Sequence, residues 1–136
     1  MYKIIGKEID INEIINMVKN PKAGAIVTFI GTTRDFSRGK KVLSLEYDAY
    51  LAMAERKLRE IGDEVKKKWD IEDIAIVHRI GKLYIGEASV GIAVSSAHRK
   101  EAFEACHYTI DRLKEIVPIW KKEVYEGKEV WIEGEI

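Results

Sequence analysis

The spacing of apolar residues alternates along the chain between a helical and a strand-like period, and the order of these changes limits the possible folds. A helical period occurs in residues 10–20, 51–68 and 98–117. Strand-like patterns occur in residues 24–34, 42–50, 73–81 and 88–97, and as a hairpin in residues 119–134 with Gly127 at its turn. Because strands and helices do not strictly alternate, we predict an α+β fold with a mixed or mainly antiparallel sheet.

Capping and proline signals predict where the helices begin and end. Asp10 followed by Glu13 has the spacing of a capping box, and Pro21 lies beyond that helix. Pro118 ends the helix that begins near His98, because proline cannot continue a helix. Residues 34–41 (RDFSRGKK) and 82–87 (KLYIGE) are predicted to connect strands.

The length and charge of the chain exclude several classes of protein. We expect residues 1–136 to form one domain, because this length supports one sizeable core. The 23 basic and 23 acidic residues cancel, so the molecule as a whole has no attraction for nucleic acid or a membrane surface. Without a signal peptide, an apolar run long enough to cross a bilayer, or a second cysteine to pair with Cys106, the expected location is the cytoplasm.

Three lysines surround a helix-ending corner in the segment DRLKEIVPIWKKE, residues 111–123. Lys114 precedes Pro118, and Lys121 and Lys122 follow it. Lysines usually lie on solvated faces, and that interpretation stays open here. A corner, however, can direct side chains into a cleft. If Lys114 and Lys121 converge there, each disfavours the charge of the other, and one amine can act as a base.

The segment SSAHR, residues 95–99, lies where a strand gives way to a helix. Ser95 or Ser96 is a candidate N-cap, and His98 and Arg99 fall in the first helical turn beside free backbone N–H groups. Such a helix end with a guanidinium suits a phosphate or carboxylate, although a plain cap with exposed polar residues fits the pattern equally well. Arg34, at the end of a predicted strand and before a glycine-bearing loop, is a second candidate for binding anions.

Other reactive residue types give no catalytic pattern. Cys106 lies on the apolar face of a predicted helix and is expected to fill the core. His78 and His107 have no partner at metal-ligand spacing, so we expect no metal site. The chain also lacks the G-x-S-x-G turn of serine hydrolases.

Several segments together resemble one enzyme family. FIGTTRD, LEYDAY, VHRIGKLYIGEASVGIAVSSAHRKEAFEA and DRLKEIVPIWKKE resemble, in the same order from about Gly24 to Gly134, the large catalytic subunit of molybdopterin synthase. The resemblance implies an α/β-hammerhead-like fold. It also implies an enzyme, a sulfurtransferase, that inserts two sulfur atoms into cyclic pyranopterin monophosphate and forms the dithiolene of molybdopterin, in molybdenum cofactor biosynthesis.

The same resemblance implies partners and site residues. Sulfur arrives as the C-terminal Gly–Gly thiocarboxylate of a small ubiquitin-like subunit, a homodimer forms the core of a 2+2 heterotetramer, and no resident cofactor is needed. The residues that match the family's catalytic positions are Lys114 and Lys121. Those that match or adjoin its substrate-binding positions are Thr32, Thr33, Arg34, His98, Arg99, Lys122 and Glu123. Some members have lysine and valine at the positions of Thr32 and Thr33.

Helix geometry adds a constraint to this set. Arg99 and Lys114 are fifteen positions apart on one predicted helix, so their Cα atoms lie about 22 Å apart. If both serve one small substrate, as the resemblance implies, the simplest solution is that the His98–Arg99 end comes from a second copy of the chain across a two-fold interface. Two other classes of protein are alternatives. One is a non-catalytic module that binds the tail of a ubiquitin-like protein, and the other is an RNA-binding domain, which the zero net charge disfavours.

Overall fold

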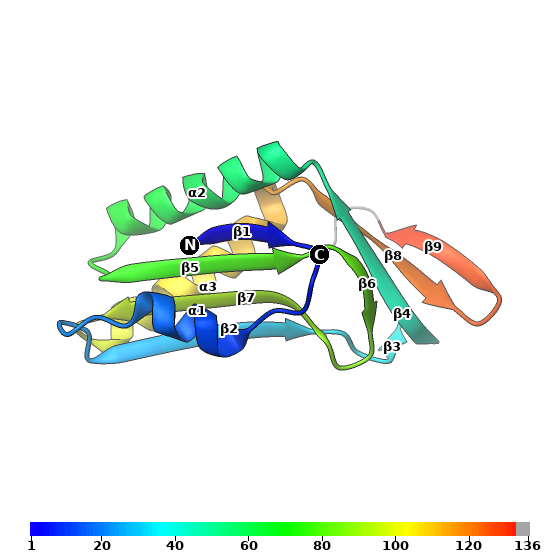
Figure 1. Ribbon diagram of the computed structural model, residues 1–136, viewed down its shortest axis with the longest axis horizontal. Coiled ribbons are helices and arrows are strands. Elements are labelled where there is room, and N and C mark those ends of the chain that lie inside the picture. The colour runs from blue at the N-terminus through cyan, green and yellow to red at the C-terminus, as the bar shows by residue number, and fades with distance from the viewer. Residues whose placement is uncertain (133–136) are drawn as a thin grey trace.

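A computed structural model describes residues 1–132, and in this part of the chain two sheets share the core with the helices (Figure 1). The helices are α1 (Ile11–Val18), α2 (Leu51–Lys68) and α3 (Arg99–Ile116). The first sheet has the strand order β1 (Tyr2–Ile5), β5 (Asp73–Arg79), β7 (Ala88–Ser96) and β2 (Ala25–Thr32). The second contains β3 (Phe36–Ser37), β4 (Lys40–Ala49), β6 (Gly81–Tyr84), β8 (Ile119–Tyr125) and β9 (Lys128–Ile132).

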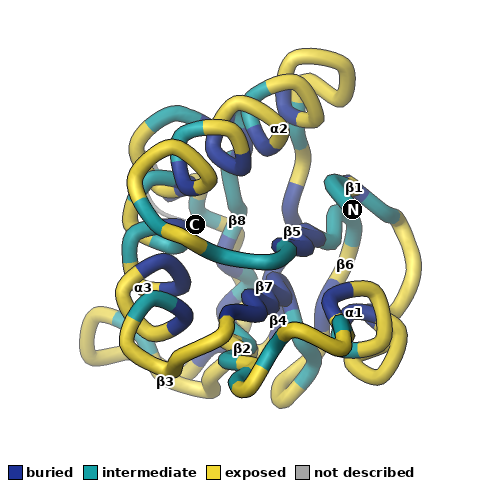
Figure 2. The backbone as a smooth tube through the Cα atoms, turned by 90° about the vertical axis from the view of Figure 1, so that its left-hand side faces the viewer, coloured by how far each residue is buried: buried dark blue, intermediate teal, exposed yellow. Residues whose placement is uncertain are grey.

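The first sheet is covered on both faces. α2 and α3 pack on one face and α1 on the other, as the end-on view shows (Figure 2). Its central strands are accordingly apolar on both sides: Ile74, Ala75 and Ile76 follow one another in β5 and are all buried. A strand buried on both faces loses the strict alternation of polar and apolar residues.

The second sheet continues the same core but crosses the first sheet steeply (Figure 1). β4 is central, with β8 on one edge and β3 and β6 on the other, all antiparallel to it. Side chains on β8 alternate between the two faces, so that Ile119, Glu123 and Tyr125 are buried. The order of elements and the mixed pairing confirm the predicted α+β fold.

The predicted helix ends are confirmed where the sequence signals were strongest. The side chain of Asp10 accepts a hydrogen bond from the Glu13 amide at 3.2 Å, as the capping pattern predicted. The serine cap predicted for α3 is wrong. His98 occupies the N-cap position without a side-chain cap bond, and the Ser96 hydroxyl donates instead to the His98 carbonyl.

Short strands were the main omission. β1 pairs in parallel with β5 and makes the first sheet mixed. The predicted connection at residues 34–41 contains β3 and the start of β4, with Arg38 and Gly39 at positive φ in the turn between them. The segment 82–87 includes most of β6. The β8–β9 hairpin turns at Gly127 (φ 77°) as predicted, whereas its end at Gly134 lies outside the described residues.

Candidate active site

A cavity of about 310 Å³ lies where the two sheets and the C-terminal end of α3 meet. Three basic residues line it: Arg34, Lys114 and Lys121. They are joined by the polar residues Thr32, Ser37, Tyr47, Ser89 and Glu123. Phe29, Leu45, Val90 and Ile110 supply apolar wall. We call this the basic cavity.

The corner at Pro118 explains how Lys114 and Lys121 reach one cavity. Lys114 is in the last turn of α3, and the chain then reverses so that β8 runs antiparallel to β4. The Tyr50 amide donates to the Pro118 carbonyl at 3.3 Å, which ties the corner to the start of α2. Lys114 is exposed and makes no hydrogen bond or ion pair with another residue of the described part of the chain.

Arg34 reaches the cavity from the turn after β2. Thr33 fixes this turn: its amide and its hydroxyl both donate to the Glu87 carbonyl, at 3.0 and 3.1 Å. Gly86 donates back to the Thr33 carbonyl at 2.7 Å. Thr33 is therefore buried and holds the loop in place, while its neighbour Thr32 lines the cavity.

A buried carboxylate forms part of the cavity wall. Glu123 is only 1% exposed and accepts a hydrogen bond from the Tyr125 hydroxyl at 3.0 Å. Tyr47 lies beside it on the neighbouring strand, and burial raises the pKa of its hydroxyl. The ring of Tyr47 meets that of His78 edge-on, with centroids 5.0 Å apart.

Lys122 lies on the opposite face of β8 from the basic cavity. Its ammonium contacts Glu46 and Glu129, each at 3.1 Å, and lies 5.3 Å from the centre of the Trp131 ring. Hydrogen bonding to Glu46, followed by that to Glu129, raises the pKa of Lys122. The structure therefore separates Lys122 from Lys121.

His98 and Arg99 lie in a second pocket, with Gly24, Ala97 and Lys100. They are at the N-terminal end of α3, and Lys114 is at the other end of that helix. The strands give the same separation, because Ala25 of β2 pairs with Ser96 near His98, while Thr32 at the far end of β2 lines the basic cavity. Within one chain the two groups of residues do not meet.

The cysteine and the other two histidines lie outside the basic cavity. Cys106 is 4% exposed, lies outside the basic cavity, and burial raises its pKa to about 11, so its thiol stays protonated. His78 is fully buried, one ring nitrogen lies 2.8 Å from the Arg79 carbonyl, and burial lowers its pKa to about 4. Exposed His107 contacts Asp111 at 3.3 Å. No cluster of metal-ligating residues occurs in residues 1–132.

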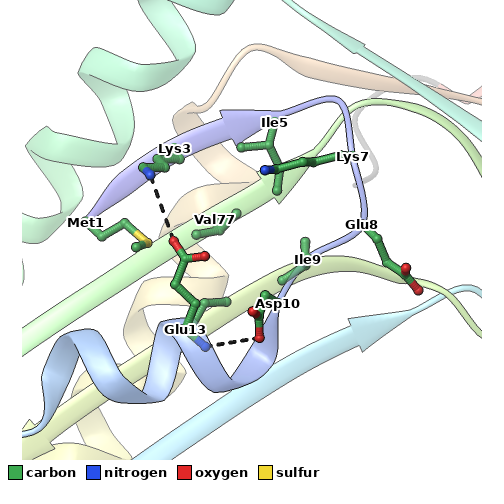
Figure 3. Close-up of a pocket in the computed structure, with 10 residues that line it drawn as sticks. Met1, Lys3, Ile5, Lys7, Glu8, Ile9, Asp10, Glu13 and Val77 are labelled. Carbon is green, nitrogen blue, oxygen red and sulfur yellow. Dashed lines mark hydrogen bonds and ion pairs between the residues drawn. The ribbon is translucent and has the colours of Figure 1, made fainter.

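Another cavity, of about 220 Å³, lies between β1 and α1 (Figure 3). Lys3 and Glu13 face each other across it with 4.0 Å between their charged atoms, and Val77 and Ile9 are among the apolar residues that line it. None of the candidate catalytic or substrate-binding residues lines this cavity.

None of the described helices is long and apolar enough to cross a membrane.

Sequence reasoning missed Ser37, Tyr47 and Ser89 as cavity residues. Tyr47 alternates with polar residues on the apolar side of a predicted strand, and this pattern predicted a core residue. Ser89 lies in a strand that is buried along nearly its whole length. A polar residue in a buried strand is the signal that singles out Ser89, because such groups need a partner. Its hydroxyl donates to the Gly31 carbonyl at 3.3 Å.

Fold and site together define an α+β protein with a basic cavity at the junction of two sheets. The MoaE protein family matches residues 4–116. The molybdopterin synthase catalytic subunit of Bacillus subtilis is 53% identical over 131 residues, which cover 96% of this chain and 83% of that protein. The chain therefore belongs to the MoaE family.

Solved structures agree with this assignment. Molybdopterin synthase from Staphylococcus aureus superposes with a TM-score of 0.93 at 46% identity, over 96% of each chain. A complex of subunits 1 and 2 of molybdopterin-converting factor from Helicobacter pylori shares the fold, with a TM-score of 0.79 at 23% identity over 96% of this chain and 89% of that one.

Proposed function

We propose that this chain transfers sulfur from the C-terminal thiocarboxylate of a small ubiquitin-like subunit to cyclic pyranopterin monophosphate, forming the dithiolene of molybdopterin. The observation that carries the proposal is that Arg34, Lys114 and Lys121 line one cavity. The family's known relatives, named as molybdopterin synthase catalytic subunits, support the same reaction.

The sulfur comes from a partner because the chain has no thiol suited to the role. Cys106 is the only cysteine in the sequence, and it is buried with a raised pKa. A thiolate is the nucleophilic form of cysteine, so a buried and protonated thiol is a poor sulfur carrier. A thiocarboxylate that enters the cavity on a flexible tail brings its own nucleophile.

The two lysines have different roles. The thiocarboxylate sulfur bonds to a side-chain carbon of the pterin as a carbon–oxygen bond at that carbon breaks and the oxygen leaves with a proton. Water then cleaves the bond between that sulfur and the partner's acyl carbon, which releases a carboxylate. Lys114, exposed and without a partner among the described residues, transfers the protons. Lys121, on the cavity wall formed by β8, orients the substrate and stabilises developing negative charge. Two sulfur atoms require two loaded partners.

Anion binding falls to Arg34 and to the second pocket. A guanidinium forms paired hydrogen bonds with phosphate, and Arg34 is held at the cavity by the anchored turn at Thr33. Thr32 and Glu123 complete the polar wall on the substrate side. Lys122 supports β8 through Glu46 and Glu129 and acts outside the cavity.

The geometry of β2 supports a shared site in a homodimer. β2 is an edge strand in the described part of the first sheet, and Ile26 and Phe29 on it are more than a third exposed. Its eight residues span about 23 Å, which matches the separation of Arg99 and Lys114 along α3. A two-fold axis near the middle of β2 therefore brings His98 and Arg99 of one copy to the basic cavity of the other.

The small subunit docks where its tail can enter the basic cavity, which gives one such partner for each copy of this chain and a 2+2 assembly. The cytoplasmic location expected from the sequence remains a prediction.

Reconstitution tests the proposed activity. Wild-type protein, the thiocarboxylated small subunit and the pterin precursor should yield dithiolene, measured after conversion to a fluorescent pterin derivative. The small subunit with an ordinary C-terminal carboxylate is the matched control and should give none. Tight binding of the tail without any turnover would instead support the alternative of a non-catalytic tail-binding module.

A further inference from the structure

Two lysines contact one aromatic ring at the end of the second sheet. The ammonium groups of Lys40 and Lys128 each lie 5.8 Å from the centre of the Tyr125 ring. They come from different strands: Lys40 begins β4, and Lys128 begins β9, where it is the direct partner of Tyr125. Each cation is attracted to the electron-rich face of the ring, so the ring holds both lysines close together.

This pair of like charges has no carboxylate counter-ion among residues 1–132. Both lysines are exposed, and neither forms an ion pair with a carboxylate of residues 1–132. Side-chain hydrogen bonding and charge from Lys40 lower the pKa of Lys128, as expected for two ammonium groups that repel each other. The neighbouring Lys122, by contrast, is neutralised by two glutamates. An anion that contacts both Lys40 and Lys128 would add two attractions that outweigh the one repulsion.

The pair lies beside the basic cavity but outside it. Tyr125 donates its hydroxyl to Glu123, which lines the cavity, while the same ring carries the two lysines. On the other side, Lys40 pairs with Ser37 across the β3–β4 turn, and Ser37 also lines the cavity. Lys40 and Lys128 are not part of the lining, so a small substrate enclosed in the cavity does not reach them.

We propose that Lys40 and Lys128, held close together at the ring of Tyr125, form a docking site for an acidic side chain of the sulfur-carrying subunit beside the basic cavity. This rests on the proposed function. A protein whose tail enters the cavity also covers the surface beside it and so reaches this pair, whereas a small pterin enclosed in the cavity does not. Charge pairs at the edge of an interface speed association and set orientation.

A charge-reversal experiment tests the site through binding alone. Lys40→Glu and Lys128→Glu are combined, and the affinity for the small subunit with its ordinary carboxylate is measured by calorimetry at low and high salt. The matched control combines Lys66→Glu and Lys67→Glu on the exposed face of α2, which changes the net charge equally. We expect affinity at low salt to fall about 30-fold or more for the first variant and less than about 2-fold for the control.

The partner identifies the docking group. Acidic residues on the small subunit are changed to lysine one at a time, and one of these variants should restore binding to the Lys40→Glu/Lys128→Glu protein. Equal losses for both double variants would show a general effect of net charge and would overturn the proposal. The proposal would also be overturned if the Lys40→Glu/Lys128→Glu protein no longer binds inorganic phosphate but keeps its affinity for the small subunit. The lysine pair would then hold a free anion.

The same titration separates this inference from the proposed function. If the wild-type chain does not bind the small subunit at all, the proposed function fails. If the wild-type chain binds and the charge-reversed protein binds equally well, only the docking site fails.

Discussion

The two sheets of this molecule differ in how they are covered and in the residues that they contribute to the basic cavity. The first sheet is covered by helices on both faces, and its strands are almost continuously apolar. The second sheet has one face that joins the core and then opens into the basic cavity, so Lys121 and Glu123 on β8 stand near buried Ile119. The first sheet is therefore the more continuously apolar one, and the second sheet, with the end of α3, adds Lys114, Lys121 and Glu123 to the cavity that residues of β2 and β7 also line.

Removal of a cavity lysine is expected to have the largest effect and to leave stability unchanged. Lys114→Ala should lower the rate of dithiolene formation about 100-fold or more, as expected for the loss of a proton-transferring group. Because the exposed side chain of Lys114 contributes little packing, the unfolding midpoint of the Lys114→Ala protein in urea should match that of the wild type. The control Lys67→Ala, on the outer face of α2, should retain full activity. Near-normal turnover by folded Lys114→Ala would remove the catalytic role.

A titration in the first sheet should change stability and not chemistry. Burial holds the pKa of His78 at about 4, below its ordinary value of 6.5, so the folded state favours the neutral ring. The stability that this provides is complete above pH 6.5 and is lost as the pH falls from 6.5 to 4, by about 3 kcal/mol.

The measurement is urea unfolding at pH 7 and at pH 4.5, in the wild type and in His78→Gln, which can still donate to the Arg79 carbonyl but does not titrate. Carboxylates that are hydrogen-bonded in the fold contribute equally to both proteins, so the difference isolates His78. The same pH dependence in both proteins would show that His78 is not the titrating group.

Arg34 should affect substrate binding more than the chemical step. Arg34→Ala removes a charged hydrogen-bond donor, which contributes about 1.5–3 kcal/mol, so the KM for the pterin precursor should rise about tenfold or more. The turnover number should change less, because Lys114 and Lys121 remain. Arg34→Lys keeps the charge but not the paired hydrogen-bond geometry, so its KM should lie between those of the wild type and Arg34→Ala. A fall in turnover number with KM unchanged would place Arg34 in the reaction step instead.

Cys106 gives the smallest expected effect. Cys106→Ala removes a buried sulfur atom from the core and should lower the free energy of unfolding by about 1 kcal/mol. Turnover per folded molecule, measured with the thiocarboxylated partner, should equal that of the wild type. Loss of activity in a stable Cys106→Ala protein would contradict the proposed source of sulfur.

The sequence predicted the long elements and missed what depends on distant contacts. α2 and α3 are long enough for the helical spacing of their apolar residues to be recognised. β1 has only four residues and forms because it pairs with the edge of β5. The lysines at the Pro118 corner were recognised, and strand alternation explains why Lys121 reaches the cavity and Lys122 does not. The burial of Glu123 depends on Tyr125 and on the second sheet, which no local pattern reveals.

The shared site is the central claim, and subunit mixing tests it most directly. Inactive Lys114→Ala and inactive Arg99→Ala proteins are mixed and allowed to exchange subunits, with exchange followed by mass spectrometry. Each hybrid dimer then has one of its two cavities with both residues wild type, so activity should return, up to half that of a wild-type dimer for each hybrid. No recovery despite demonstrated exchange, or a monomer active at every concentration, would show that each cavity belongs to a single chain.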